Sequence, residues 1–108
     1  MSLTIIARNK ALNALTPATI SVHSADPTST GNANIIGTAQ SITYGVASNG
    51  VRSATTVPEF EIPPSVTVAW TVLKDSAGDV LNIKALPVPE TYANGGTHRI
   101  ASSTITLT

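Results

Sequence analysis

The first stretch of the chain places apolar residues at three- and four-residue steps, which is the spacing of one helix face. Ser2 can cap such a helix, and Thr16-Pro17 ends it because proline disfavours a helical residue before it. The pattern predicts an amphipathic helix over residues 2–15, which needs an apolar surface to lie on because a helix this short is marginal alone. Its apolar face comprises Leu3, Ile6, Ala7, Ala11, Ala14 and Leu15.

From Ala18 onward the pattern changes to the two-residue alternation of half-buried strands. Ile20 and Val22 share one face of the first strand, and Ser21 and His23 share the other. Further alternating stretches cover residues 41–46, 51–57, 66–73, 80–83, 98–100 and 104–108, separated by turns at 48–50, 75–78 and 94–96. The pattern predicts a mainly β fold, a small antiparallel β-sandwich or barrel of about seven to eight strands with one N-terminal α-helix. Residues 1–17 form a docking or assembly element and residues 18–108 form the β-sandwich domain of a single-domain protein.

Prolines mark two places where the strands are expected to be irregular. Phe60 and Ile62 are bracketed by prolines, so residues 58–64 are predicted to form an edge strand or a crossover. Pro87 and Pro89 are predicted to interrupt a later strand, because proline cannot donate to a ladder.

Composition and charge narrow the classes of partner. Six basic and six acidic residues give a formal net charge of zero, and only 11% of the residues are charged. Ser and Thr make up about a quarter of the chain, and there is no cysteine. Nucleic acid is therefore not an expected partner, and no apolar stretch is long enough to predict a membrane span. The N-terminus does not have the pattern of a secretory signal. A surface with so little charge favours association with other proteins.

Few residues could carry out catalysis. His23, Ser24 and Asp26 have the residue types of a serine hydrolase, but neighbouring strand residues point to opposite faces. Glu59 and Glu61 lie on the same side of an extended segment, so they form either a general acid and base pair or a charged edge that discourages stray pairing, and we favour the edge. Two histidines without a third ligand do not predict a zinc site. We expect no enzyme activity, no metal and no cofactor.

The segment after the first strand is a long loop rich in turn-forming residues. It could suggest a calcium site, but it offers one carboxylate where calcium usually takes several. We expect instead that Asp26 holds a turn through its side chain, Pro27 fixes its φ angle and Gly31 takes a positive φ. The candidate contact loop therefore comprises Asp26, Pro27, Gly31 and Asn32.

Three segments together carry a family resemblance. The opening helix over residues 3–15 is followed by Ile20-Ser-Val-His-Ser-Ala-Asp-Pro-Thr-Ser-Thr-Gly-Asn32, then by the Thr-rich strand and turn Val66-Thr-Val-Ala-Trp-Thr-Val-Leu-Lys-Asp-Ser-Ala-Gly-Asp79. The chain ends with Gly95-Gly96 and an Ile-Thr-Leu strand. In this order the chain resembles a family of small tailed-bacteriophage virion proteins, which are labelled capsid decoration, head fibre, minor capsid or tail fibre proteins.

The resemblance implies a non-enzymatic structural protein of the virion, made in the bacterial host cytoplasm. The expected function is that of a capsid decoration or cement protein, or a head-fibre-type protein, which self-associates, with a trimer favoured, and binds phage major capsid subunits on the capsid surface. One alternative is a tail or fibre-attachment subunit bound to other virion proteins. The candidate assembly interface comprises Leu3, Ile6, Leu12, Phe60 and Ile62.

An alternative from another class is a carbohydrate-binding β-sandwich, which needs an exposed aromatic platform. Trp70 lies in the most apolar strand and is predicted to be a core residue, with an interface anchor as the alternative.

Overall fold

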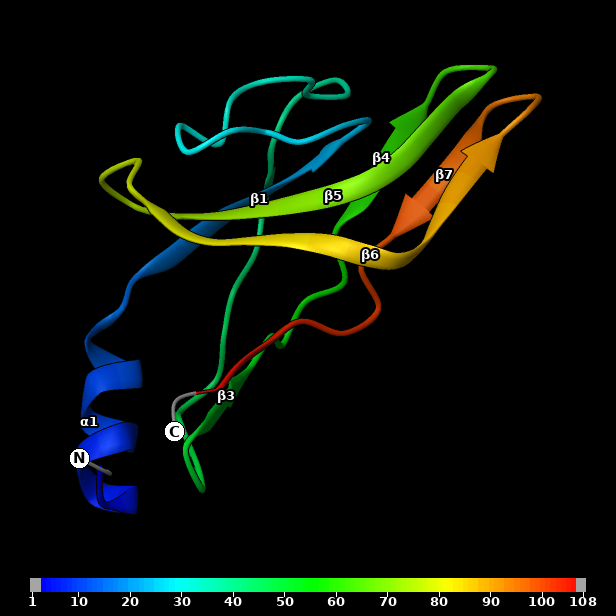
Figure 1. Cartoon of the computed structure of the whole chain (residues 1–108). Helices are drawn as coiled ribbons and strands as arrows, with labels where there is room; N and C mark the ends of the chain where they lie inside the picture. The colour runs from blue at the N-terminus through cyan, green and yellow to red at the C-terminus, as the bar shows by residue number, and fades with distance from the viewer. Residues whose placement is uncertain (1–2, 107–108) are drawn as a thin grey trace.

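The computed structural model describes residues 3–106, which form one helix and eight strands with only antiparallel pairings (Figure 1). The prediction of a mainly β fold with one N-terminal helix is confirmed. The elements are α1 (Ile5–Ala14), β1 (Pro17–His23), β2 (Gln40–Ser41), β3 (Val51–Ser53), β4 (Glu59–Ile62), β5 (Val66–Asp75), β6 (Val80–Tyr92), β7 (Gly96–Arg99) and β8 (Thr104–Thr106).

Helix α1 is shorter than the predicted helix. It starts after Thr4, whose hydroxyl accepts a hydrogen bond from the backbone N–H of Ala7 at 3.1 Å. Thr4 therefore caps the helix, while the predicted cap Ser2 lies outside the described residues. The helix ends at Ala14, and Leu15 already has an extended backbone before Thr16-Pro17.

The predicted apolar face of the helix is wrong. Leu12 is the buried residue of α1, whereas Ile6 is 70% exposed. The helix does not lie on the face of the large sheet but at one end of the molecule beside β3 (Figure 1). Hydrogen bonds hold it there, so it needs no continuous apolar stripe.

Four strands form the main sheet in the order β2-β1-β5-β6. The hairpin between β5 and β6 turns where predicted, because Gly78 takes a φ of +89° and the carboxylate of Asp75 accepts hydrogen bonds from the backbone N–H groups of Ala77 and Asp79. Two ribbons complete the fold, β3 with β8 and β4 with β7, in a sandwich-like arrangement.

The prolines interrupt the pairing of the late strand but not the strand itself, because its pairs with β5 stop at Ala85 and resume at Glu90. Strand β6 continues through Pro87 and Pro89 to Tyr92. Two features accommodate the prolines: β6 is an edge strand of the main sheet, and its register with β5 shifts between the pairs Val68–Glu90 and Trp70–Ala85. On an edge, a missing N–H costs no ladder hydrogen bond when it faces away from the partner strand.

The core lies between one face of the main sheet and the ribbon that carries Phe60 and Ile62. Burial alternates along β4, with both glutamates exposed and both apolar residues buried. Trp70 is half-buried and is not part of this cluster, so its predicted core position is not observed. The cluster consists of Ile20, Val22, Ile36, Ile42, Phe60, Ile62, Val68 and Leu73.

The loop after β1 covers the opposite face of the main sheet. Gly31 takes a φ of +69°, and a Cβ atom there would lie 2.9 Å from a methyl group of Val72 and 2.9 Å from one of Val80. Only glycine therefore allows the loop to approach the sheet this closely. Because both faces are covered, β1 is buried at four successive positions, Ile20 to His23.

Candidate functional site

One end of the molecule, termed here the helix–hairpin end, consists of α1 and the hairpin over residues 43–55. The side-chain oxygen of Asn13 accepts a hydrogen bond from the backbone N–H of Ala47, and that of Asn9 accepts one from Gly50, both at 2.9 Å. These asparagines lie four residues apart and so share one helix face. Polar side chains thus attach the helix to the hairpin.

Arg52 fastens the C-terminal end of the helix. Its guanidinium donates hydrogen bonds to the carbonyl oxygens of Leu12 at 2.9 Å and of Leu15 at 2.8 Å, and to that of Gly45 at 2.7 Å. Sequence reasoning missed this arginine. The Asn9 and Asn13 spacing was the available signal that the inner helix face is polar.

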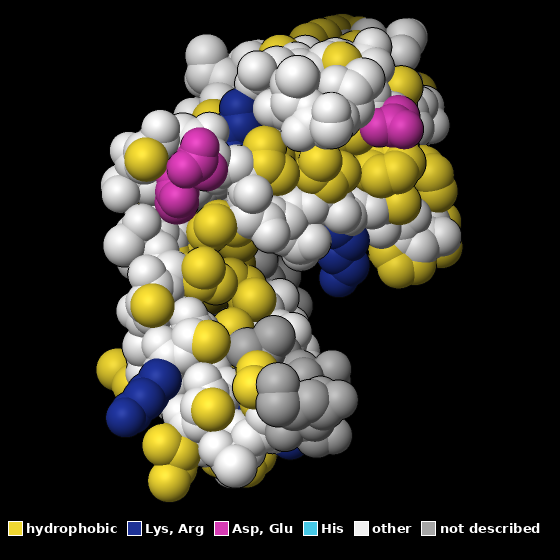
Figure 2. Space-filling model, turned by 60° about the vertical axis from the view of Figure 1, so that its left-hand side comes forward, with side chains coloured by type: hydrophobic (Ala, Val, Ile, Leu, Met, Phe, Trp, Pro, Cys, Tyr) yellow, Lys and Arg dark blue, Asp and Glu magenta, His cyan; other side chains and the backbone are white. Residues whose placement is uncertain are grey.

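Three apolar side chains on the helix–hairpin end are exposed. Ile6 is 70% exposed, Ile5 is 43% exposed, and Val46 on the hairpin is 82% exposed. Figure 2 shows hydrophobic side chains on the lower part of the molecule, with few charges among them. Burial of apolar side chains of this size against a partner lowers the free energy of the complex.

The five residues of the predicted assembly interface have different environments. Ile6 is exposed and Leu3 is half-buried. Leu12, Phe60 and Ile62 are buried within the chain itself, at 2–3% exposure, so their side chains present almost no surface. Ile6 is therefore the largely exposed residue of that set, and Val46, which is also largely exposed, was not among the predicted residues.

The predicted contact loop is largely attached to its own sheet. Pro27 and Gly31 are buried, and the carboxylate of Asp26 accepts a hydrogen bond from the N–H of Thr28 at 2.8 Å, which confirms the predicted turn. Asn32 is exposed and accepts a hydrogen bond from the ammonium group of Lys74 on β5.

His23 and Ser21 form a buried pair beneath this loop. The Ser21 hydroxyl lies 2.7 Å from Nε2 of His23, and Nδ1 lies 2.7 Å from the carbonyl oxygen of Ala33. Burial lowers the pKa of His23, and the charge of Lys74 lowers it further, although the hydrogen bond to Ala33 opposes them. The His23 side chain is fully buried, so the pair has no access to a substrate. Ser24, the partner considered from the sequence, is exposed.

A second polar cluster joins β6 and β7. The Tyr92 hydroxyl donates a hydrogen bond to Glu90 at 3.1 Å and lies 2.8 Å from Nδ1 of His98. Burial and the adjacent Glu90 raise the pKa of Tyr92.

The glutamate pair considered from the sequence does not act together as an acid and base, because Glu59 forms an ion pair with Arg99 at 3.0 Å across the β4–β7 ribbon. Within residues 3–106, no group of three or more His, Asp or Glu side chains is arranged to hold a metal ion.

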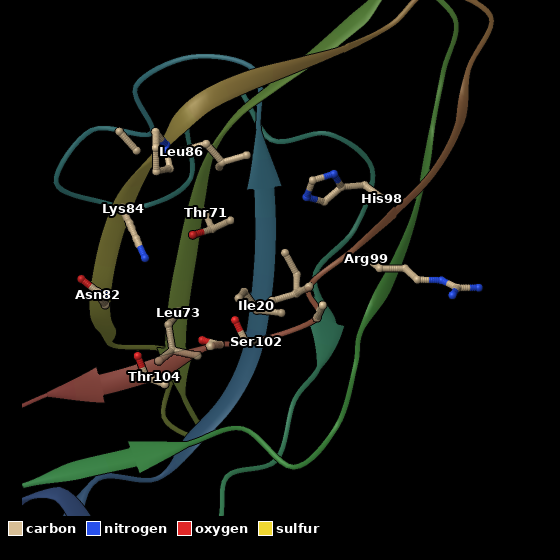
Figure 3. A pocket seen from close by; sticks show the side chains of 15 residues that line it. Ile20, Thr71, Leu73, Asn82, Lys84, Leu86, His98, Arg99, Ser102 and Thr104 are labelled. Atoms are coloured by element: carbon tan, nitrogen blue, oxygen red, sulfur yellow. The ribbon is translucent and has the colours of Figure 1, made fainter.

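A cavity of about 290 Å³ lies between the main sheet and the segment over residues 98–104 (Figure 3). Paired residues of three neighbouring strands form its floor. Asn82 of β6 lies opposite Leu73 of β5, and Leu73 lies opposite Ile20 of β1. Lys84 pairs with Thr71 in the next row. The segment over residues 98–104 adds Ser102, Ser103 and Thr104 to the wall.

Comparison of the chain with protein-family profiles, with curated proteins and with solved structures gave no match. The helix in residues 3–106, α1, is too short to cross a membrane.

Proposed function

We propose that this chain is a non-enzymatic structural subunit of a tailed-bacteriophage particle. On this proposal it is a capsid decoration or cement protein that forms a homo-oligomer, with a trimer favoured, and binds the major capsid protein. The observation that carries the proposal is the helix–hairpin end, where Ile6 and Val46 are largely exposed. The sequence resemblance supplies the class of particle.

The attachment of α1 explains how this surface can be available without weakening the fold. Asn9 and Asn13 hold the helix through hydrogen bonds, so its exposed apolar side chains, Ile5 and Ile6, are not needed in the chain's own core. Full burial of an Ile or Val side chain stabilises a contact by about 1.5–3 kcal/mol. The zero net charge of the chain adds no long-range repulsion between neighbouring copies.

No structural observation favours the carbohydrate-binding alternative. That function needs an exposed aromatic platform. The chain has four aromatic residues, all in its described part, and each is buried or half-buried: Tyr44, Phe60, Trp70 and Tyr92.

The experiment is cryo-electron microscopy of phage particles that carry the chain. We expect density for it on the capsid surface, with the helix–hairpin end at the contact. The test variant combines Ile6→Asp with Val46→Asp, and the matched control is Val88→Asp on β6, because Val88 is 76% exposed but lies outside the helix–hairpin end.

The double variant is expected to be folded by circular dichroism and to be lost from purified particles at least tenfold relative to the control. Density on the tail alone would replace the capsid proposal with the tail or fibre-attachment alternative. Absence of the chain from purified particles would overturn the virion proposal, and normal incorporation of the double variant would overturn the role of the helix–hairpin end.

A further inference from the structure

The cavity between the main sheet and residues 98–104 has basic residues in its lining but no acidic ones. Lys84, His98 and Arg99 line it, whereas none of the six acidic residues of the chain does. Since the chain as a whole is neutral, this asymmetry is a local property of the cavity. A positively charged hollow favours an anionic group.

The three basic groups are not equally available. Arg99 is paired with Glu59 and its guanidinium points away from the cavity (Figure 3). His98 is bonded through Nδ1 to Tyr92 and lies 3.1 Å from Glu90. Lys84, by contrast, makes no ion pair or side-chain hydrogen bond with any residue in the described range 3–106. It is therefore the cation that a ligand can engage.

Lys84 stands beside groups that complement a carboxylate with a hydrocarbon body. Thr71 lies directly opposite Lys84 across the β5–β6 pairing, and Ser102 and Thr104 bring hydroxyl donors from the facing segment. Ile20, Leu73 and Leu86 supply apolar surface in the same hollow. One ammonium group with hydroxyl donors matches the single charge of a carboxylate.

We propose that this cavity binds a carboxylate-bearing ligand, with the carboxylate on Lys84 and its carbon chain against Leu73 and Leu86. The volume of about 290 Å³ is at the lower end of the range for small-molecule sites, which suits a ligand of amino-acid size. A small organic acid and an acidic side chain of another protein both present this chemistry. The proposal does not rest on the virion function, because the cavity lies outside the helix–hairpin end.

The experiment is a titration of the full chain, followed by NMR chemical shifts of backbone amides. The free-acid probe is pentanoate, and the protein-like probe is glutamate with an acetylated amino group and a methylamide at its α-carboxyl group. The neutral controls are pentanamide and the glutamine counterpart of the capped residue. We expect shifts at Asn82, Lys84 and Ser102 with the carboxylates, and weaker binding as salt is raised.

Lys84→Gln is expected to weaken carboxylate binding about tenfold, because it removes a charge-assisted hydrogen bond. The matched control is Lys10→Gln, which removes an exposed lysine from α1 and is expected to leave binding unchanged. Tighter binding of pentanoate identifies a small acid as the source of the carboxylate, and tighter binding of the capped glutamate identifies a protein side chain.

Equal shifts with the neutral amides would overturn the proposal. Unchanged carboxylate binding in Lys84→Gln would do so too, as would the lack of any shift in the cavity. If the chain proved not to be a virion protein, these outcomes would keep their meaning, since the titration measures the isolated chain.

Discussion

At the scale of single residues, the His23 pair shows how a polar side chain can hold a loop onto a sheet. The carbonyl oxygen of Ala33 can only accept, so Nδ1 of His23 carries the proton that it donates. Nε2 of the neutral ring then accepts a hydrogen bond from the Ser21 hydroxyl. The neutral form of His23 thus satisfies both of its ring nitrogens, and the loop over residues 24–36 is fixed at Ala33.

This arrangement predicts that acid destabilises the fold through His23. Burial holds the pKa of His23 below its ordinary value of 6.5, so the unfolded chain takes up a proton at a higher pH than the folded chain does. The stabilising contribution is therefore complete above the unfolded pKa and is lost as the pH falls through the lower folded pKa. Urea unfolding is expected to show a falling midpoint as the pH is lowered from about 7.5 to about 5.

His23→Gln provides the comparison for this prediction. Glutamine does not titrate, so the variant is expected to be less stable than the parent chain at pH 7.5 but to have a flatter profile across the same range. An equally steep fall in the variant would assign the pH dependence to other groups.

At the scale of elements, the C-terminal end of α1 is held by Arg52, a residue of the hairpin. The last carbonyl groups of a helix have no partners within it. Arg52 donates to two carbonyls at this end: that of Leu12, which also accepts from the backbone N–H of Leu15, and that of the C-cap residue Leu15. Its positive charge lies at the negative end of the helix dipole. The hairpin therefore stabilises the helix from outside.

Arg52→Ala is expected to loosen α1 without unfolding the main sheet. The change removes three hydrogen bonds from a charged donor, and we expect local destabilisation of about 2 kcal/mol. Hydrogen exchange of the amides in residues 8–14 should accelerate about 30-fold, since each 1.4 kcal/mol is a factor of ten. Lys10→Ala, on the exposed side of the same helix, is the control with little expected change. Unaltered protection in Arg52→Ala would show that Asn9 and Asn13 suffice.

The turns of this fold could be predicted from short stretches of the sequence. Asn49 and Gly50 have φ angles of +53° and +74°, as expected for the predicted Asn-Gly turn. These features depend on a few neighbouring residues, so they can be read without the rest of the chain.

Features set by distant segments could not be read in this way. The path of β6 through Pro87 depends on its being an edge strand, and the exposure of Ile6 depends on where the hairpin meets α1. The cavity at Lys84 arises only when residues 98–104 cross the sheet. Sequence period alone contains no information about which segment covers which face.

At the scale of the whole molecule, the chain is extended and its helix lies apart from the main core cluster. Its radius of gyration is 14.6 Å, compared with about 13 Å for a compact domain of this length. Its extents are 47 × 26 × 25 Å, and α1 lies at one end of it (Figure 1). No residue of α1 belongs to the main core cluster. The division into an assembly element and a β domain is therefore a prediction that truncation can test.

A chain that begins at Thr16 is expected to keep the sheet fold. It retains the carbonyl of Thr16, which accepts a hydrogen bond from the N–H of Ser76, and every residue of the main core cluster. The truncation removes the burial of Leu12 and leaves Arg52 with Gly45 as its remaining backbone acceptor. We expect cooperative thermal unfolding with a modestly lower midpoint.

Because Ile5 and Ile6 are absent, the truncated chain should sediment as a monomer at concentrations where the full chain self-associates. A truncated chain without cooperative unfolding would show that α1 is part of the β domain. One that self-associates as strongly as the full chain would locate the assembly surface away from the helix.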